Sequence, residues 1–267
     1  MSDNISVIHP AATHFVYKET AGPAPDGADG GWSEDLHQAL NKAGRRGLAG
    51  RVFRGEAAAA MPHGVQNIAR ADFYSWDELA PALAAGGEAV IYRQVAGNGD
   101  FPALFDRPGS IHGVTHAKRV LLHVLMLSRL AALTPAEREV LILAAKYHDI
   151  GRADDGLCTL HGAWSVEKMD RLGLFAGISG RDAAALRFII INHCVDDQEA
   201  LAGADGIEPR TVRLFKMLKD CDGLDRVRIH DLDLSYLRTA AAKRLALVAY
   251  QLLYHLPEAE DMLGIGR

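Results

Sequence analysis

The residues of this chain best suited to chemistry are histidines and aspartates at the ends of expected helices. His148 and Asp149 stand side by side at the end of an apolar stretch, VLILAAKYHDI. A buried aspartate is costly unless its charge is compensated, and a divalent metal ion does this where other histidines and aspartates converge. His116 and Asp222 lie in or directly after two other helical patterns. These four residues are candidates for binding a metal ion.

The order and the local contexts of these residues resemble the HD superfamily of metal-dependent phosphohydrolases. The first histidine stands in HAKRV, the His-Asp pair in YHDIGR and the last aspartate in KDCDGLDR. The resemblance covers the chain from Phe105 to His230 or close to it. It implies an all-helical core with one ion bound by the four residues. We prefer Asp222 as the last ligand over Asp220 and Asp225, which could cap a helix or pair on the surface.

Two further histidines match the binuclear branch of this family. His161 stands in TLHGAW, after the His-Asp pair, and His193 stands in IIINHC, at the end of the next expected helix. The resemblance implies that Asp149 bridges two ions and that these histidines bind the second. The chain departs from the family pattern at two positions. Arg152 replaces a frequent lysine, and Cys194 replaces the second histidine of a frequent pair, which leaves one second-site ligand open.

The chemistry expected of such a site is hydrolysis of a phosphomonoester or phosphodiester. A divalent ion lowers the pKa of bound water from about 15.7 to about 7, so metal-bound hydroxide is available near neutral pH. One or two ions per chain are expected, and Mn, Fe, Co, Mg and Zn all suit histidine and aspartate ligands. The expected substrate is a phosphorylated small molecule similar to a nucleotide. Four basic residues close in sequence to the ligands could stabilise phosphate charge: Arg119, Lys146, Arg152 and Lys219. Together with Asp149, which acts through the metal, they are the expected catalytic residues.

Two other functions are compatible with this sequence. Some proteins of the HD fold are di-iron oxygenases with the ligand order His, His-Asp, His, His, Asp, which this chain can also supply. The basic residues near the ligands favour a phosphate-bearing substrate, but some of these oxygenases also bind phosphonates, so both functions stay open. A non-catalytic binding module of the same fold is the third interpretation. It predicts missing metal ligands, whereas the first ligand set is complete here.

Other residues of the same types are expected to have structural roles. His112 precedes the helix of His116, and His123 lies two turns after His116, where it suits the core. Cys194 and Cys221 are expected to be small packed residues. The chain has three cysteines in all, and this odd, sparse count argues against a disulfide framework.

The elements that must position these residues are indicated by helical spacing and capping residues. Thr134 followed by Pro135 and Glu137 is a typical helix start, and the helix that it opens should end near Gly151. About six helices and no convincing strand predict an all-α bundle, the HD domain, over residues 106–267. They are expected at 113–132, from Thr134, at 163–172 with Gly173 as its cap, from Ser179, from 209 to Cys221 and from Leu234 to His255.

The N-terminal part of the chain has a different character. Residues 1–31 are expected to be a flexible arm, because AGPAPDGADGG is rich in Gly, Pro and Ala. Residues 32–105 are expected to be an extension of mixed or irregular structure and unknown role. We expect a short strand or buried segment in EAVIYRQ at 88–94. Two helices are expected as well, at 32–43 with Ser33 as N-cap and at 71–83.

Bulk composition excludes several classes of protein. The 267 residues are 49% hydrophobic and 24% charged, which is typical of a globular protein. The net charge of −5 provides no overall basic field, so a dedicated nucleic-acid-binding protein is not expected. The chain shows no signal-peptide pattern and no apolar run of membrane-spanning length, so no membrane association and a cytoplasmic location are expected. A homo-oligomer is compatible with the sequence.

Overall fold

The structure is a computed structural model that describes residues 34–45, 73–202 and 206–265. Over these residues it contains eleven α-helices, three short 3-10 helices and no strand. The prediction of an all-α protein is therefore confirmed for this part of the chain. The predicted arm at 1–31 and the predicted N-cap Ser33 lie outside the described residues. None of the helices described is long and apolar enough to cross a membrane.

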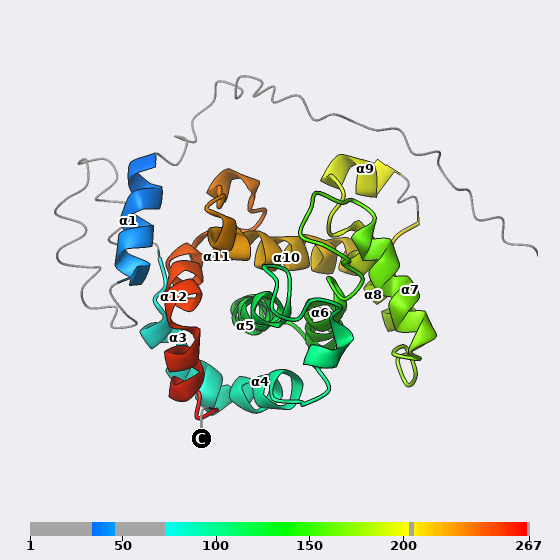
Figure 1. Cartoon of the computed structure of the whole chain (residues 1–267), viewed down its shortest axis with the longest axis horizontal. Coiled ribbons are helices and arrows are strands. Elements are labelled where there is room, and N and C mark those ends of the chain that lie inside the picture. The colour runs from blue at the N-terminus through cyan, green and yellow to red at the C-terminus, as the bar shows by residue number, and fades with distance from the viewer. Residues whose placement is uncertain (1–33, 46–72, 203–205, 266–267) are drawn as a thin grey trace, which may run out of the picture. The chain divides into compact units, whose positions relative to one another are not determined.

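The helix α5 (Val114–Leu130) lies at the centre of the helices, as Figure 1 shows. It packs against α6 (Pro135–Tyr147), α10 (Pro209–Leu224), α12 (Ala246–Met262) and α4 (Glu88–Ala96). Its residues from Leu121 to Ser128 are all buried. A helix that is apolar on every side belongs in the core, because no face of it can be exposed without cost. The packing of α5 against its neighbours therefore fixes the position of its first turn.

The start of α6 follows the prediction. The Oγ1 of Thr134 accepts a hydrogen bond from the Glu137 backbone N–H (3.3 Å), and the Glu137 carboxylate accepts one from the Thr134 N–H (3.0 Å). This reciprocal pair satisfies two N–H groups that a helix start leaves open. The helix start predicted at Ser179 is confirmed as well, since a helix begins at Gly180 and the Ser179 Oγ accepts a hydrogen bond from the Asp182 N–H.

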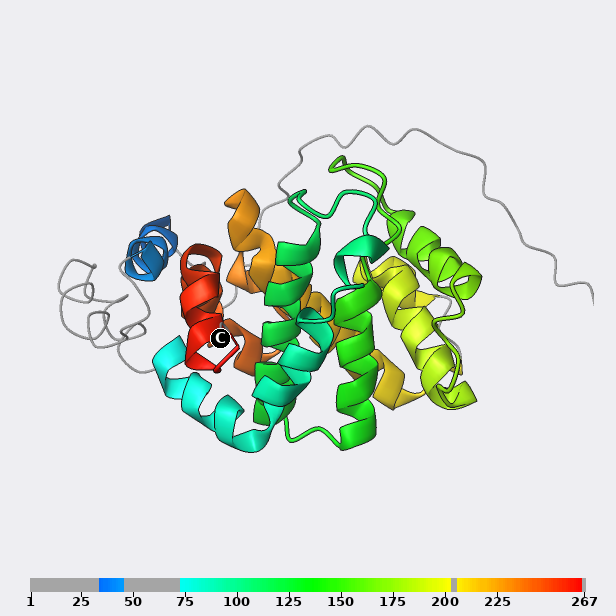
Figure 2. The same cartoon turned by 60° about the horizontal axis from the view of Figure 1, so that its bottom comes forward.

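A second group of helices covers one side of α5 and α6. The helix α7 (His161–Arg171) packs on α8 (Gly180–Asn192), and α8 packs on both α6 and α10. The short α9 (Asp197–Ala202) precedes α10. Figure 2 shows the segment before α5 and the segment between α6 and α7 on the same side of α5 and α6. An ion pair between Arg107 and Asp155 (3.4 Å) joins the two segments.

The C-terminal region differs from the prediction of one helix over residues 234–255. It consists of a 3-10 turn (Leu234–Tyr236), α11 (Ala240–Lys243) and α12. The break is fixed by Asp220, whose carboxylate accepts hydrogen bonds from the backbone N–H groups of Arg238 and Thr239. With α9 and α11 included, residues 106–267 contain eight described α-helices rather than about six.

The described part of the N-terminal extension contains helices and no strand. It contains α1 (Glu34–Arg45), α3 (Trp76–Gly86) and α4, so the strand predicted at 88–94 is wrong. Periodicity cannot separate a helix from a strand in so short an apolar run, and here Gly87 (φ +87°) lets a second helix follow α3 directly. Helices α1 and α3 pack on α12, and α4 packs on α5. Within the described residues, these contacts join the helices of the extension to helices of the region after residue 105.

Candidate metal centre

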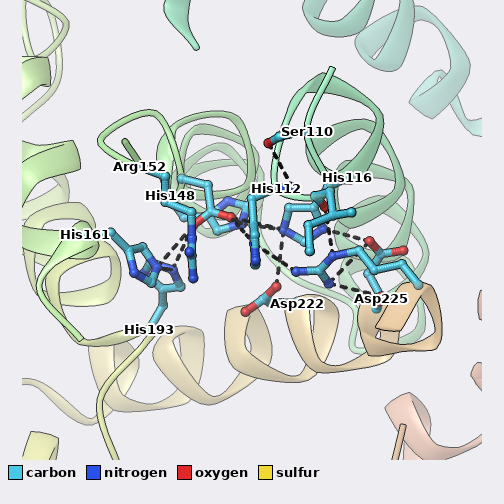
Figure 3. A network of polar contacts seen from close by, with 12 residues as sticks. Ser110, His112, His116, His148, Arg152, His161, His193, Asp222 and Asp225 are labelled. Carbon is cyan, nitrogen blue, oxygen red and sulfur yellow. Dashed lines mark hydrogen bonds and ion pairs between the residues drawn. The ribbon is translucent and has the colours of Figure 1, made fainter. Parts of the chain in front are cut away.

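The six predicted metal ligands come together where five helices begin or end (Figure 3). Helix ends are suited to this, because a side chain there points past the helix and can meet others from several directions. The ligands are His116 in the first turn of α5, His148 and Asp149 after α6, His161 at the start of α7, His193 after α8 and Asp222 in the last turn of α10.

The first set of ligand atoms surrounds the Nε2 atom of His116. This atom lies 3.0 Å from Nε2 of His148 and 3.4 Å from both Oδ2 of Asp149 and Oδ1 of Asp222. Nitrogen and oxygen atoms bound to one ion at about 2.0–2.2 Å are themselves about 3 Å apart. The four residues are therefore spaced as the ligands of one ion would be.

The second set lies on the other side of Asp149. Nε2 of His161 is 2.9 Å from Nε2 of His193, and these two atoms lie 3.1 and 3.5 Å from Oδ1 of Asp149. The Asp149 carboxylate thus directs Oδ2 to the first set and Oδ1 to the second. Oδ1 is buried and accepts no hydrogen bond within the described residues. An anionic atom in this position is well placed to bind a cation.

The other ring nitrogen of each histidine is fixed by a hydrogen bond. In His148, His161 and His193, Nδ1 lies 2.7–3.0 Å from a backbone carbonyl oxygen. A carbonyl can only accept, so Nδ1 carries the proton, and Nε2 of the neutral ring presents its lone pair to the centre. In His116 the same role belongs to Oδ2 of Asp225, at 2.7 Å from Nδ1.

Two Nε2 lone pairs that face each other at 3.0 Å would repel, so a cation must lie between them. A proton or a metal ion meets this requirement. Burial and the Arg228 charge lower the pKa of His116, but hydrogen bonds with three aspartates outweigh them and raise it to about 9. Burial lowers the pKa of His148 to about 4. The raised pKa of His116 therefore favours a protonated His116 ring when no ion is bound.

The carboxylates of the centre are ionised. Burial alone would raise the pKa of Asp149, but the neighbouring His148 and hydrogen bonds from other histidines hold it well below its usual range. The pKa of Asp222 is likewise held low, because His116 outweighs the effect of burial. One buried and one partly exposed carboxylate, with four imidazole groups, are a donor set that divalent transition ions bind well. The residues present therefore fit a metal centre of one or two ions.

Two glycines allow the helices to approach closely enough to form the second set. A Cβ on Gly162 would lie 2.3 Å from the backbone oxygen of Ile190, so this glycine permits the contact of α7 with the end of α8. A Cβ on Gly151 would lie 2.2 Å from the backbone nitrogen of Ser165. The Ser165 hydroxyl donates to the carbonyl of His148 (2.6 Å) and thereby joins α7 to the His-Asp pair.

Arg119 has a role different from the predicted contact with substrate phosphate. It is buried, and its Nε and Nη2 donate to the two carboxylate oxygens of Asp225 at 2.5 and 2.9 Å. Asp225 in turn orients His116 through a hydrogen bond with Nδ1, so Arg119 acts on this proposed ligand only through Asp225. The sequence left Asp225 as a helix cap or a surface ion pair; it follows the last turn of α10, and its side chain is fully buried rather than at the surface.

The other basic candidates differ in position. Nζ of Lys146 lies 4.9 Å from the centroid of the Tyr147 ring, and Nζ of Lys219 forms an ion pair with Asp197 (2.6 Å). No contact joins either lysine to the ligand sets within the described residues. Arg152 is the one of the four that lies beside the centre and is turned towards it, with Nε 3.4 Å from Oδ1 of Asp149.

Sequence reasoning missed two residues of the centre. His112 was expected to have a structural role, but its Nδ1 is 3.2 Å from Oδ2 of Asp149 and 3.0 Å from Nη2 of Arg228. Arg228 also donates to the carbonyl of Asp225 (3.1 Å). The spacing of His112, four residues before His116, was a signal for a shared location. His123 is a core residue, as expected, with Nδ1 3.2 Å from the Cys221 carbonyl.

Three side chains at the centre are partly exposed. The side chain of Asp222 is 28% exposed, and those of His112 and Arg152 are 14% and 12% exposed. The four imidazole ligands and Asp149 are at most 4% exposed. A ligand from solvent would therefore meet Asp222, His112 and Arg152 first.

No known protein family matches this sequence, and no curated protein or solved structure matches it either.

Proposed function

We propose that this protein is a metal-dependent phosphohydrolase of the HD type. Its substrate would be a phosphomonoester or phosphodiester of a small molecule similar to a nucleotide. The observation that carries the proposal is the position of Asp149 between two pairs of imidazole groups. In each pair the Nε2 atoms face each other at 2.9–3.0 Å, and every Nδ1 is used elsewhere. A purely structural cluster has no need of this arrangement.

The ligands divide into a first set of His116, His148, Asp149 and Asp222 and a second set of His161, His193 and the same Asp149. Divalent ions held there would acidify a bound water molecule and neutralise charge on phosphate oxygens. The chain's own contribution is to hold the donor atoms rigidly, because each ring is fixed at Nδ1 and each helix end is packed. A ligand set fixed in this way loses little entropy when it binds an ion.

The charges around the centre support a phosphate-bearing substrate. Asp149 and Asp222 would repel an anion from the empty centre, whereas two divalent ions would reverse the sign of the local charge. Arg152 is partly exposed, and its Nε lies 3.4 Å from Oδ1 of Asp149 but forms no hydrogen bond within the described residues. This N–H is available to a phosphate oxygen without the loss of another hydrogen bond. We propose that Arg152 binds the substrate phosphate.

A second candidate is a di-iron oxygenase. One observation favours the oxygenase: the six residues of its ligand order (His, His-Asp, His, His, Asp) meet around one shared carboxylate. The two functions differ in the ion and in the co-substrate. Iron together with consumption of dioxygen would support the oxygenase, whereas phosphate release without dioxygen supports the hydrolase.

The first experiment is elemental analysis of protein purified without added metal. The wild type is compared with His148→Ala, His161→Ala and His193→Ala, and with His230→Asn as a control on an exposed histidine. The binuclear centre predicts about two ions per chain, fewer in the three ligand variants and no change in the control. Phosphate release from a panel of nucleotides then tests the activity. Absence of any ion, even after reconstitution with Mn, Fe, Co or Zn, would overturn the proposal.

A further inference from the structure

The second ligand set has an additional donor that the motif comparison did not provide. Cys194 follows His193 directly, and its Sγ lies in one group with a ring nitrogen of His161 and one of His193. All three atoms are within 4.8 Å of one another. This spacing is compatible with one ion, because sulfur binds zinc at about 2.3 Å and imidazole nitrogen at about 2.0–2.1 Å.

The thiol and the His161 ring are held by the same short segment. Sγ of Cys194 donates to the carbonyl of Thr159 (3.2 Å), and Nδ1 of His161 donates to the carbonyl of Cys158 (2.8 Å). Two neighbouring carbonyls before α7 thus fix a residue from the end of α8 and a residue from the start of α7. The half-buried thiol faces the second ligand set rather than the apolar core.

We propose that Cys194 binds the second ion as a thiolate. This inference rests on the metal centre of the proposed function and extends it to the class of the ion. The second ion would then have two imidazole nitrogens, one sulfur and Oδ1 of Asp149 as protein ligands. On coordination the thiol releases its proton to solvent. Thiolate and imidazole ligands select Zn, Fe or Co over the hard ions Mg and Mn.

The position of Cys194 distinguishes it from the other two cysteines. Among the described groups that could hold an ion, neither Cys158 nor Cys221 provides a ligand atom. Cys221 is fully buried within the core. Cys158 lies three residues before His161 and is partly exposed as Cys194 is, which makes it a matched control.

The test is titration of the metal-free protein with cobalt(II), followed by absorption spectroscopy. A thiolate bound to cobalt gives a charge-transfer band in the near ultraviolet, whereas nitrogen and oxygen ligands give only the weaker visible bands. The wild type and Cys158→Ser are expected to show the near-ultraviolet band, and Cys194→Ser is expected to lose it. If the wild type shows visible bands from bound cobalt but no charge-transfer band, the role of Cys194 is overturned and the metal centre stays intact. Absence of cobalt binding would overturn both.

A second measurement needs no variant and covers the case in which Cys194→Ser does not fold. The rate of alkylation at each cysteine of the wild type is followed by peptide mass spectrometry, with and without zinc. Because coordination removes the thiolate from reaction, zinc is expected to slow alkylation of Cys194 by roughly tenfold or more. The rate at Cys158 should be unchanged. If bound zinc slows alkylation of Cys194 and Cys158 equally, or slows neither, the proposal is overturned.

Discussion

Asp225 accepts a hydrogen bond from Nδ1 of His116 at 2.7 Å, on the side of the ring that faces away from the proposed ion. The same carboxylate accepts two hydrogen bonds from Arg119. A guanidinium, a carboxylate and an imidazole therefore form a continuous chain from the interior to the first ligand set. Such a chain fixes the ring and increases the donor strength of Nε2.

We expect Asp225→Asn to weaken binding of the first ion by about 10–100-fold, because the ring loses its anionic partner. The control is Asp220→Asn, which alters a fully buried aspartate near the end of α10, the helix that Asp225 directly follows. Asp220 holds the break before α11 and has no contact with His116 within the described residues. Competition with a chromophoric chelator measures both affinities. Equal losses in the two variants would contradict the role of Asp225.

Metal binding should depend on pH in a defined direction. An ion must displace the proton from His116, whose pKa is raised to about 9. Apparent affinity should therefore rise about tenfold per pH unit from neutral pH up to about 9, and then level off. Zinc affinity measured over this range tests the slope. A flat profile would show that no proton is released from His116.

Stability of the metal-free protein should be greatest near the pKa of an unperturbed histidine. The folded pKa of His116 is raised to about 9, so the folded state binds the extra proton and loses stability as pH rises from about 6.5 through about 9. The folded pKa of His148 is lowered to about 4, so stability falls as pH drops from about 6.5 towards 4. Thermal unfolding over this range measures the maximum. Saturating zinc should remove the decline on the alkaline side.

Gly162→Ala should separate α7 from α8 and disrupt the second ligand set. The added methyl group would meet a backbone oxygen of α8 at 2.3 Å, which cannot move aside as a flexible side chain can. We expect the bound metal to fall to about one ion per chain, with helical circular dichroism retained. Gly180→Ala is the control, because open space surrounds its Cβ position at the start of α8. Two ions in Gly162→Ala would show that the close approach is not required.

Arg152→Ala should lower kcat/KM for a phosphorylated substrate by about 100-fold without loss of bound metal, because one donor to the phosphate is removed. Lys219→Ala, by contrast, removes the ion pair with Asp197 and should affect thermal stability with little change in activity. Steady-state kinetics on metal-loaded protein separates the two residues. An unchanged kcat/KM in Arg152→Ala would contradict its contact with substrate.

The ligand positions were predictable because they coincide with helix ends that the sequence marks clearly. The capping residues Thr134 and Ser179 define where α6 and α8 start, and the apolar spacing carries each helix to its histidine. The ordered motifs then indicated which histidines and aspartates belong together. Local signals and ligand order therefore agreed, and the convergence of all six residues follows from both.

The surrounding residues were harder to predict because their roles depend on tertiary contacts. Arg119 shares the helix of His116, but only the packing of α5 on the segment after α10 shows that it binds Asp225. His112 lies in a turn whose course no periodicity defines. Cys194 looks like a small packed residue until the start of α7 is placed beside it. In each case the deciding partner is more than 30 residues away in the sequence.

The Nδ1 groups of His148 and His193 each donate to a carbonyl three residues earlier in the same helix. Each ring therefore closes the last turn of its own helix, and the ring cannot rotate unless that turn unwinds. Release of an ion and fraying of α6 or α8 then become coupled local opening events. The lifetime of a bound ion would be governed by the stability of two helix ends as much as by the strength of the metal–nitrogen bonds.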